Sequence, residues 1–517
     1  MNVRLLAALL VIGSAATLTT AQQPASPLEP RARKERINEA GTPGVLRPLR
    51  RTASSPTFTI DTDGITLPDD GTAVDPDTGA RYRRGELLVR YEEGASTTVR
   101  TLAMRAGRAT GILRTLAKDW ELVALDPAIS ATQAADALRG SDGVRDVSLN
   151  YLVTTQQFRP NDENYSLQWN FPLINLPSAW QINPGGRDDL VVAVIDTGLN
   201  TVNDTIVFFS PFVGQVPAVF SAVPDLVTAG RITSPRDFIF DDDLPVDLEG
   251  HGTHVAGTIA QLTNNNIGVA GVAFNVKLMP LKVLSGDWDD ILAPGNFGGS
   301  TALVADAIRH AADNNAKVIN LSLGGEGSAP AVRDAIKYAV EKGAFVAIAA
   351  GNSAEDGNPT EYPAAYGGEI NGAMTVGAVN RSLQRADYSG FHSYVEICAP
   401  GGEITTNVDY ANGVTQVSYD DDATLDIFPL FAKVAALRAG FRPRFDRFEL
   451  RPFQGTSMAT PHISGVAALL YSQGIRSPPA IEEAIKKFAR PLGLRPEECG
   501  AGLVDARRAL RGLGLGR

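Results

Sequence analysis

Cysteine is scarce in this chain, because its 517 residues include only Cys398 and Cys499. Two cysteines can form at most one disulfide, which excludes a small disulfide-rich protein. The fold must therefore depend on hydrophobic cores, for which the chain is long enough. Cys398 ends an apolar, strand-like segment, and we expect it to be a buried packing thiol. A bridge between the two cysteines is the alternative. The length also predicts more than one domain.

Long apolar runs are equally scarce. The apolar run at residues 5–12 is shorter than the roughly twenty residues that a membrane-spanning helix needs. It follows Arg4 and precedes small residues up to Ala21, which is typical of a secretory signal peptide. We therefore predict a signal peptide over residues 1–21, no membrane anchor, and a secreted protein that is extracellular or periplasmic.

Positive charge is in deficit, since 47 Lys and Arg residues face 58 Asp and Glu residues, for a formal net charge of -11. Phosphate binding needs clustered cations, so the balance argues against nucleic acid as a partner. A basic cluster does lie between Arg31 and Arg51. It belongs to residues 22–84, which are rich in Pro, Thr, Asp and Gly and have few large apolar side chains. We predict a disordered linker there, with a solvated basic tail rather than an anionic partner.

A compact segment follows at residues 85–158, where strand-like and helix-like runs alternate. The strands are predicted at 85–91, 120–125 and 146–153 and the helices at 97–108 and 131–138. The order β-α-β-β-α-β predicts a small α+β domain. An accessory binding domain is one interpretation of such a segment.

Three later strings carry the residue types of nucleophilic catalysis. A buried strand over residues 191–195 ends in an acid, a small-residue helix begins with a histidine, and another begins with a serine; the strings are Asp196-Thr197-Gly198, Gly250-His251-Gly252-Thr253-His254 and Gly455-Thr456-Ser457-Met458-Ala459. A serine hydroxyl is a weak nucleophile at neutral pH, so it needs a histidine base and a carboxylate that orients the histidine. Taken alone, Ser457 could instead be a helix N-cap.

In the order Asp, His, Ser, these strings resemble the subtilisin-like serine proteases, or subtilases. The resemblance runs from about Asn161 to the end of the sequence. It implies that Asp196 orients the imidazole, that His251 acts as general base and then acid, and that Ser457 attacks the scissile carbonyl. It also selects His251 over His254, which the residues alone do not. A zinc site at this His pair is the competing interpretation, but no glutamate follows His251 and no third ligand is evident.

A fourth string, at residues 345–352, is another buried strand that ends in Asn352. By itself a Gly-Asn pair after a strand indicates a turn. The resemblance implies instead that the Asn352 amide and the backbone N–H of Ser457 form the oxyanion hole.

The resemblance further implies a cleft in which extended polypeptide pairs through its main chain. Its predicted lining comprises Ser322, Leu323 and Gly324 on one edge, Gly298 and Gly299 on the other, and Ala350 and Gly351 in the first pocket. Segments without bulky side chains let another backbone approach closely, which favours broad specificity. Glu361 falls where many family members place a small residue at the pocket floor. Its carboxylate either favours Lys, Arg or long polar side chains before the cleaved bond or points to solvent.

No cofactor is expected for catalysis, but residues 263–269 resemble the calcium loop of the family. Calcium takes several oxygen ligands, and the implied set is Thr263, Asn265, Ile267 and Val269 with Asp204 and Asp162. A polar loop that ends a helix is the alternative. The acidic run at residues 241–243 is expected to be solvated surface, and a second, weaker calcium site is the alternative.

Between the catalytic strings, predicted strands at 318–323, 345–349 and 374–379 alternate with helices at 301–314 and 331–342. Such alternation predicts a doubly wound parallel α/β sheet with right-handed crossovers. Asp196 and Asn352 then fall at the carboxyl ends of strands, where ligand crevices form.

The predicted organisation is a signal peptide (1–21), a linker (22–84), a prodomain (85–158) and a peptidase domain (159–517) with an insertion at about 403–453. The β-α-β-β-α-β segment resembles the subtilase prodomain, which implies an intramolecular inhibitor whose tail, residues 151–158, occupies the cleft until the enzyme cuts itself between about Val153 and Tyr165.

We predict a monomeric, secreted serine endopeptidase, autoprocessed from a precursor, that acts through an acyl-enzyme. A catalytically silent peptide-binding protein on the same fold is the second hypothesis, disfavoured because all four catalytic positions are filled.

Overall fold

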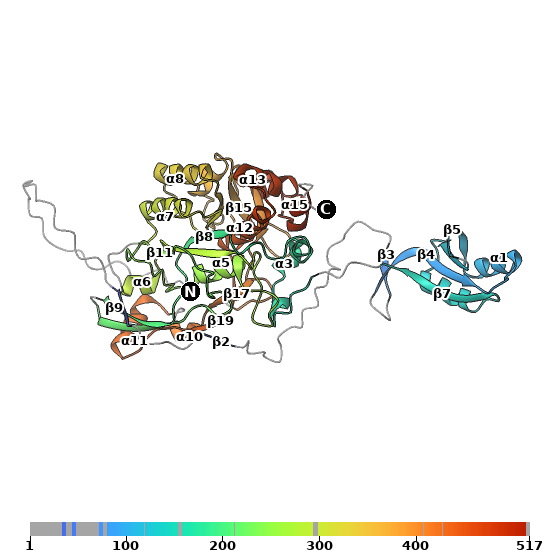
Figure 1. Ribbon diagram of the computed structural model, residues 1–517, viewed down its shortest axis with the longest axis horizontal. Coiled ribbons are helices and arrows are strands. Elements are labelled where there is room, and N and C mark those ends of the chain that lie inside the picture. The colour runs from blue at the N-terminus through green and yellow to red at the C-terminus, as the bar shows by residue number, and fades with distance from the viewer. Residues whose placement is uncertain are drawn as a thin grey trace, which may run out of the picture.

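The structure is a computed structural model that describes residues 34–37, 44–47, 72–75, 80–117, 119–152, 158–210, 212–292, 298–406, 408–425 and 428–512. The predicted signal peptide and most of residues 153–158 lie outside the described residues. The described chain forms a small domain, which ends with residue 152, and a large domain, which begins at residue 158 (Figure 1).

Seven parallel strands form the central sheet of the large domain. In spatial order they are β11 (Arg236–Asp237), β12 (Lys277–Lys282), β8 (Val191–Asp196), β13 (Val318–Leu321), β14 (Phe345–Ala349), β15 (Ala373–Val379) and β16 (Ile397–Pro400). From β8 to β16 these strands are buried along their whole length, because helices cover both faces of a parallel sheet. The predicted doubly wound sheet is therefore confirmed.

Helices on the two faces of the sheet create two separate cores. The helices α5 (His251–Ala260) and α12 (Thr456–Ser472) pack on one face, and α7 (Thr301–Asp313) and α8 (Pro330–Glu341) on the other (Figure 1). Strand side chains alternate between the faces, so Val192 of β8 joins the first core whereas its neighbours join the second. None of the described helices is both long and apolar enough to span a bilayer.

Shorter helices surround these layers. They are η2 (Tyr165–Leu167), α3 (Asn170–Leu173), α4 (Leu176–Trp180), α6 (Asp287–Leu292), α9 (Ala364–Gly367), α13 (Pro478–Lys487), α14 (Pro496–Cys499) and α15 (Ala506–Arg511). Of these, α13 and α15 pack beside α12. The helix α12, which carries Ser457 in its first turn, is thus enclosed between the sheet and an outer layer.

The small domain has the predicted order of elements and a core of its own. Its elements are β3 (Thr72–Val74), β4 (Arg81–Tyr91), α1 (Thr97–Ala106), β5 (Ala109–Ala117), β6 (Trp120–Leu125), α2 (Ala131–Arg139) and β7 (Val144–Tyr151). The strand β4 pairs with β3, β6 and β7, all antiparallel. The domain begins earlier than the predicted residue 85, because β3 and the first residues of β4 precede that point.

The predicted insertion at residues 403–453 is built into the large domain. It forms β17 (Val414–Tyr419), α10 (Asp421–Thr424), α11 (Leu430–Arg438), β18 (Arg444–Phe445) and β19 (Arg447–Phe453). The antiparallel pair β17 and β19 packs on α5, and β18 pairs with β10 (Gly214–Phe220), which itself pairs with β9 (Asp204–Ser210). The insertion therefore supports the helix that begins with His251.

Two strands from the predicted linker lie on the large domain. The strand β1 (Lys34–Ile37) pairs antiparallel with β9, and β2 (Val45–Leu46) pairs parallel with β19. Together with β3, they make the prediction of disorder wrong for these residues. An edge strand draws its stability from partners far along the chain, so its own composition does not reveal it.

The two cysteines form a disulfide between β16 and the end of α14. Both are buried, with 0% of Cys398 and 2% of Cys499 exposed. The expectation that Cys398 is a free packing thiol is therefore wrong. Its apolar surroundings were predicted correctly, but a partner 101 residues away leaves no local signal.

Candidate active site

Asp196 and His251 meet at the carboxyl end of the central sheet. Asp196 is the last residue of β8 and His251 the first of α5, and Asp196 Oδ1 lies 2.6 Å from His251 Nδ1. Gly250 adopts φ 97°, and a Cβ there would lie 2.4 Å from Ser418 Oγ, so only glycine suits this turn. With Nδ1 held by the carboxylate, Nε2 is left as the nitrogen that can exchange a proton.

Negative charge around His251 stabilises its protonated form. Burial disfavours the imidazolium, but the attraction of Asp196 and smaller contributions from Glu249 and Asp247 outweigh it and raise the pKa of His251 to about 9. An acid that stabilises the imidazolium is what proton transfer from a serine requires.

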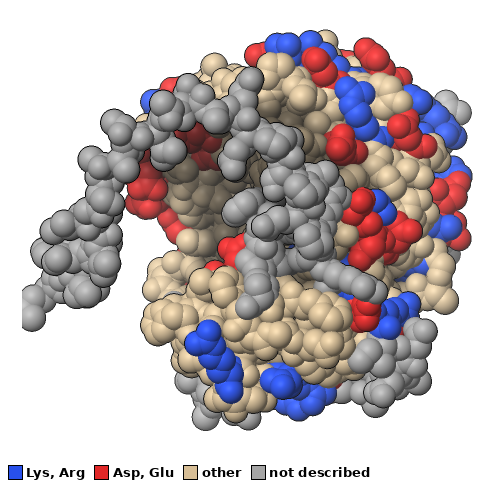
Figure 2. Space-filling model, turned by 90° about the vertical axis from the view of Figure 1, so that its left-hand side faces the viewer, with Lys and Arg blue, Asp and Glu red and all other residues tan. Residues whose placement is uncertain are grey.

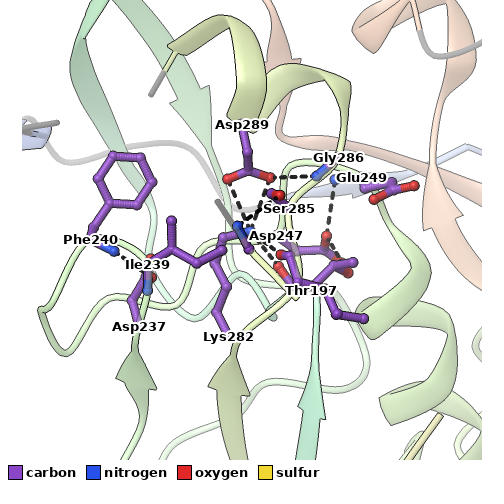
Figure 3. Close-up of polar contacts among 12 residues, drawn as sticks. Thr197, Asp237, Ile239, Phe240, Asp247, Glu249, Lys282, Ser285, Gly286 and Asp289 are labelled. Carbon is purple, nitrogen blue, oxygen red and sulfur yellow. Dashed lines mark hydrogen bonds and ion pairs between the residues drawn. The ribbon is translucent and has the colours of Figure 1, made fainter. Parts of the chain in front are cut away.

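A buried polar cluster holds the segments on either side of this pair (Figure 3). Lys282 of β12 donates to the carbonyl of Thr197 at 2.7 Å and pairs with the buried Asp289 at 3.1 Å. Asp247 accepts from Thr197 Oγ1 at 3.0 Å and from Gly250 N at 2.8 Å. The residue after Asp196 and the residue before His251 are therefore fixed to the same carboxylate. This cluster leaves no local pattern in the sequence, because its members come from distant segments.

Ser457 is the second residue of α12 and does not cap it. The N-cap is Gly455, with no side-chain capping bond. Ser457 Oγ donates to the carbonyl of Ser322 at 3.3 Å, and Ser322 Oγ donates to the carbonyl of Ser457 at 2.8 Å. In the described residues no hydrogen bond joins Ser457 to His251. The capping alternative is thus wrong, and the start of α12 is tied to the end of β13.

The Asn352 amide has a defined orientation. Its Oδ1 accepts from both the backbone N and the Oγ1 of Thr456, each at 2.9 Å. The carbonyl oxygen is therefore occupied, and Nδ2 is the group left to donate. A Cβ on Gly455 would lie 3.5 Å from Nδ2, which places this donor beside the residues that lead into Ser457. The isolated-turn interpretation does not account for these contacts.

Glu361 points inward rather than to solvent. Its side chain belongs to a residue only 8% exposed, and a Cβ on Gly351 would lie 2.2 Å from Glu361 Oε1. A Cβ on Gly324 would lie 2.9 Å from Oε2. The carboxylate thus occupies the space left by two glycines of the predicted pocket, and the alternative of a solvent-facing Glu361 is wrong.

The remaining residues of the predicted cleft follow strand ends. Ser322, Leu323 and Gly324 continue from β13, and Ala350 and Gly351 continue from β14. On the other edge, Gly298 N donates to Ser285 Oγ at 3.2 Å and Gly299 N donates to Val283 O at 2.6 Å. The next residue of the first edge, Gly325, pairs with Tyr362 through its main chain.

His254 makes its contacts with the insertion rather than with Asp196. Its Nε2 donates to Val414 O at 3.0 Å and to Arg451 O at 3.2 Å, and its ring stacks on Phe453. Burial and the nearby His251 lower the pKa of His254 to about 3, so the ring is neutral. In the part of the chain that the structure describes, no three His, Cys, Asp or Glu side chains cluster as a metal site. The zinc interpretation therefore gains no support.

The predicted calcium loop contacts two carboxylates, one of which was not predicted. Asp162 accepts from Asn264 N at 2.8 Å, and Asp225 accepts from Asn265 Nδ2 at 2.5 Å. Burial, with a contribution from Asp162, raises the pKa of Asp225 to about 6. Asp204 differs from the prediction, because its carboxylate pairs with Arg36. No spacing along the chain distinguishes Asp225 from Asp204.

Two known families match the sequence. The subtilase family (peptidase S8) matches residues 187–502, which include all four catalytic candidates. The N-terminal prodomain of fervidolysin matches residues 68–150, which correspond to the small domain.

Known proteases are similar over most of the chain. An extracellular protease of Xanthomonas campestris is 32% identical, over 83% of this chain and 71% of its own length. Thermitase of Thermoactinomyces vulgaris is 31% identical, over 68% of this chain and all of its own. A solved protease of Pseudoalteromonas arctica is 31% identical with a TM-score of 0.52, covering 68% of this chain and 99% of its own.

Proposed function

The chain belongs to the subtilase family, a family of serine proteases, and on that basis we propose that Asp196, His251 and Ser457 are its catalytic triad and Asn352 its oxyanion donor. The protein is a serine-type endopeptidase with a prodomain. The observation that carries the assignment is the 2.6 Å contact between Asp196 and His251 at the edge of the sheet where Ser457 and Asn352 are joined through Thr456.

The reaction starts when His251 Nε2 takes the proton of Ser457 Oγ and this oxygen attacks the scissile carbonyl. Asp196 stabilises the imidazolium that results. Asn352 Nδ2 and the backbone N–H of Ser457 bind the oxyanion of the tetrahedral intermediate. His251 then protonates the leaving amine, which gives an acyl-enzyme, and water activated by the same imidazole hydrolyses it.

The substrates are extended polypeptides gripped through their main chain. Support comes from the small residues in the two cleft edges, Ser322 and Gly324 on one and Gly298 and Gly299 on the other, and from the hydrogen bond that Ser322 Oγ donates to the carbonyl of Ser457. A strand added between such edges gains main-chain hydrogen bonds that are independent of sequence.

A serine-directed inhibitor tests this function against the silent-scaffold hypothesis. We expect the mature protein to hydrolyse casein, the inhibitor to stop hydrolysis, and mass spectrometry to find one adduct on Ser457. Casein left intact by correctly folded, processed protein would favour a peptide-binding role instead.

The acid limb of the pH profile of kcat/KM should report the pKa of His251, which its acidic neighbours raise to about 9. Only neutral His251 accepts a proton, so kcat/KM should fall about tenfold per pH unit below that pKa. Replacing the exposed Glu249 by Gln removes a negative charge, lowers this pKa and shifts the limb to lower pH by roughly a few tenths of a unit. Glu341→Gln, an exposed change at the end of α8, should leave the profile unchanged. If Glu249→Gln and Glu341→Gln have the same pH profile of kcat/KM, Glu249 does not affect the pKa of His251.

Glu361 is the proposed selectivity residue. Its buried carboxylate should favour Lys, Arg or long polar side chains before the cleaved bond. We expect Glu361→Gly to reduce the preference for Lys over Phe about tenfold or more in a peptide series. Glu361→Gln keeps the shape and removes the charge, so it should lose most of the same preference. A specificity profile that neither variant alters would exclude the role.

Calcium is the proposed structural ion of the loop at 263–269. The carboxylates of Asp162 and Asp225, the Asn265 side chain and the carbonyls of Thr263, Ile267 and Val269 would hold it. Two facts support the fit: both acids contact this loop and the charge of Asp162 raises the proton affinity of Asp225, and Gln261, whose amide donates to Asp225, has a buried Oε1 without a hydrogen-bond partner among the described residues. A hard cation takes such oxygen ligands and would lock the loop.

Chelation should therefore accelerate heat inactivation. Calcium at a hundred times its Kd stabilises the native state by about 2.7 kcal/mol, which a chelator removes. We expect Asp225→Asn to inactivate fast with or without chelator, and Asp188→Asn, an exposed control, to respond like the wild type. If the chelator does not change the rate of heat inactivation of the wild-type protein, the proposed calcium site is contradicted.

Secretion and self-processing complete the proposal. Relatives from Xanthomonas campestris and Dichelobacter nodosus are named extracellular proteases, and a buried disulfide suits an oxidising compartment. We propose cleavage after the prodomain, between about Val153 and Tyr165, by the enzyme itself. Residues 153–157 lie outside the described part of the chain.

A further inference from the structure

Two segments, residues 34–37 and 44–47, precede the prodomain in sequence but lie on the peptidase domain, and together they are here called the arm. The first extends the sheet of β9, with Lys34 opposite Phe208 and Ile37 opposite Thr205. The second extends β19, with Arg47 N donating to Phe448 O at 2.9 Å. The arm therefore supplies an edge strand to each of two accessory sheets.

The ammonium group of Lys34 occupies a site built for a cation. Its Nζ donates to Asp237 Oδ2 at 2.5 Å and to the carbonyl of Leu244 at 2.6 Å, with Asp242 Oδ1 at 3.2 Å. It also lies 4.4 Å from the centre of the Phe240 ring. The side chains of Lys34 and Asp237 are 2% and 0% exposed. A buried lysine with two acids, a carbonyl and an aromatic face is not a surface ion pair.

Backbone hydrogen bonds fix the orientation of the Asp237 carboxylate that binds Lys34. Its Oδ1 accepts from the backbone N of Ile239 at 2.9 Å and of Phe240 at 3.0 Å. Figure 3 shows these three residues beside Lys282 and the cluster that fixes the loops around Asp196 and His251. Loss of Lys34 would leave a buried carboxylate without its direct cation, which is strongly unfavourable.

The other two cations of the arm repeat this pattern. Arg36 pairs with Asp204 and Arg47 pairs with Asp420 at 2.6 Å, and both carboxylates are buried. Figure 2 views the domain from the side of β9 and α6 and shows several separate groups of acidic side chains there. The basic residues of the arm thus meet buried acids of their own chain.

Tight packing accompanies the charges. A Cβ on Gly44 would lie 2.7 Å from the Phe448 ring and 3.0 Å from the carbonyl of Ala222, so the backbone lies directly on the domain. The Leu46 side chain packs against the large core and covers Gly268 of the proposed calcium loop. Shape and charge both identify this surface as a binding site for the arm.

We propose that the arm is a second anchor that holds the prodomain on the peptidase domain after the chain between them has been cut. The proposal rests on the proposed self-cleavage. Because the prodomain lies between the arm and the peptidase domain in sequence, a cut after the prodomain leaves arm and prodomain on one fragment. The arm keeps that fragment on the peptidase domain, and it holds the prodomain, the intramolecular inhibitor that the family resemblance implies, at high local concentration near the cleft. Release of the active site is therefore slower than self-cleavage.

The test uses the full-length Ser457→Ala chain, which cannot cut itself, with a site for a sequence-specific protease inserted after Leu152. After external cleavage, release of the labelled N-terminal fragment is followed by size-exclusion chromatography over time and at rising salt. Lys34→Met/Arg36→Gln/Arg47→Gln should release it about tenfold faster or more than the parent. Lys337→Gln/Arg507→Gln/Arg511→Gln removes the same charge from exposed positions of the peptidase domain and should not.

Equal release rates for the arm variant and the charge control would overturn the anchor. The single change Arg36→Gln, at a half-exposed side chain, should also raise the release rate of the fragment, by a smaller factor. Because it disturbs the fold less, it tests the proposal even if the triple variant misfolds. A synthetic peptide of residues 31–50 added to the parent should accelerate release, and no effect would also count against the proposal. Failure of the wild-type protein to mature would instead overturn self-cleavage and leave these results standing.

Discussion

Replacing Ser457 by alanine is expected to abolish both proteolysis and maturation. The variant keeps the packing of α12, because Ser457 Oγ makes one long hydrogen bond, at 3.3 Å, and caps nothing. It loses the only atom that the proposed mechanism allows to attack the substrate. Removal of this serine in the family's reference enzyme costs roughly a millionfold in kcat, and we expect a loss of that order here.

Casein or peptide hydrolysis and the mass of the secreted protein measure the two effects. The control is Ser472→Ala, which removes a hydroxyl at the other end of α12, where its Oγ bonds the carbonyl of Ala468. We expect that variant to mature and to retain activity. Turnover by Ser457→Ala above a hundredth of the wild-type rate would exclude Ser457 as the nucleophile.

Asn352→Ala should lower kcat by about a hundredfold to a thousandfold and leave KM nearly unchanged. The amide donates to an oxygen that is negative only in the transition state, so its loss raises the barrier without weakening substrate binding. That range is the known cost of losing this donor in the family's reference enzyme. Self-cleavage should slow in parallel.

The contacts of Asn352 with Thr456 complicate this test, because alanine also removes an acceptor. Thermal unfolding therefore accompanies the kinetics, and Asn314→Ala, at an exposed helix end, provides a matched control. A thousandfold loss in a normally stable protein would fit an oxyanion donor. Near-normal kcat, or a loss confined to KM, would require another donor.

The catalytic candidates could be proposed from the sequence because their signals are local. Each catalytic candidate lies at or just beyond the end of a strand or in the first two residues of a helix, within one short string, and a parallel sheet brings strand ends together. The predicted strands at 318–323, 345–349 and 374–379 agree with β13, β14 and β15 to within two residues. Continuous apolar runs identify strands that are buried on both faces.

What the sequence did not reveal depends on contacts between distant residues. Asp225 and Asp204 are both acids near strand-like segments, and only the folded chain shows which one meets Asn265. The arm was read as solvated because its basic residues have no acidic neighbours in sequence, whereas its partners Asp204, Asp237 and Asp420 lie far along the chain. Glu361 was ambiguous until the two glycines that make room for it were located.

The bond between Cys398 and Cys499 has a consequence for a protease that works among copies of itself. The segment between the two cysteines contains the whole insertion at residues 403–453 and all of α12. A single nick in that segment opens the chain but releases no piece, because both halves stay covalently joined through the sulfur atoms. The disulfide closes a covalent loop that contains α12. A single proteolytic cut within this loop therefore leaves α12 covalently attached to the rest of the chain.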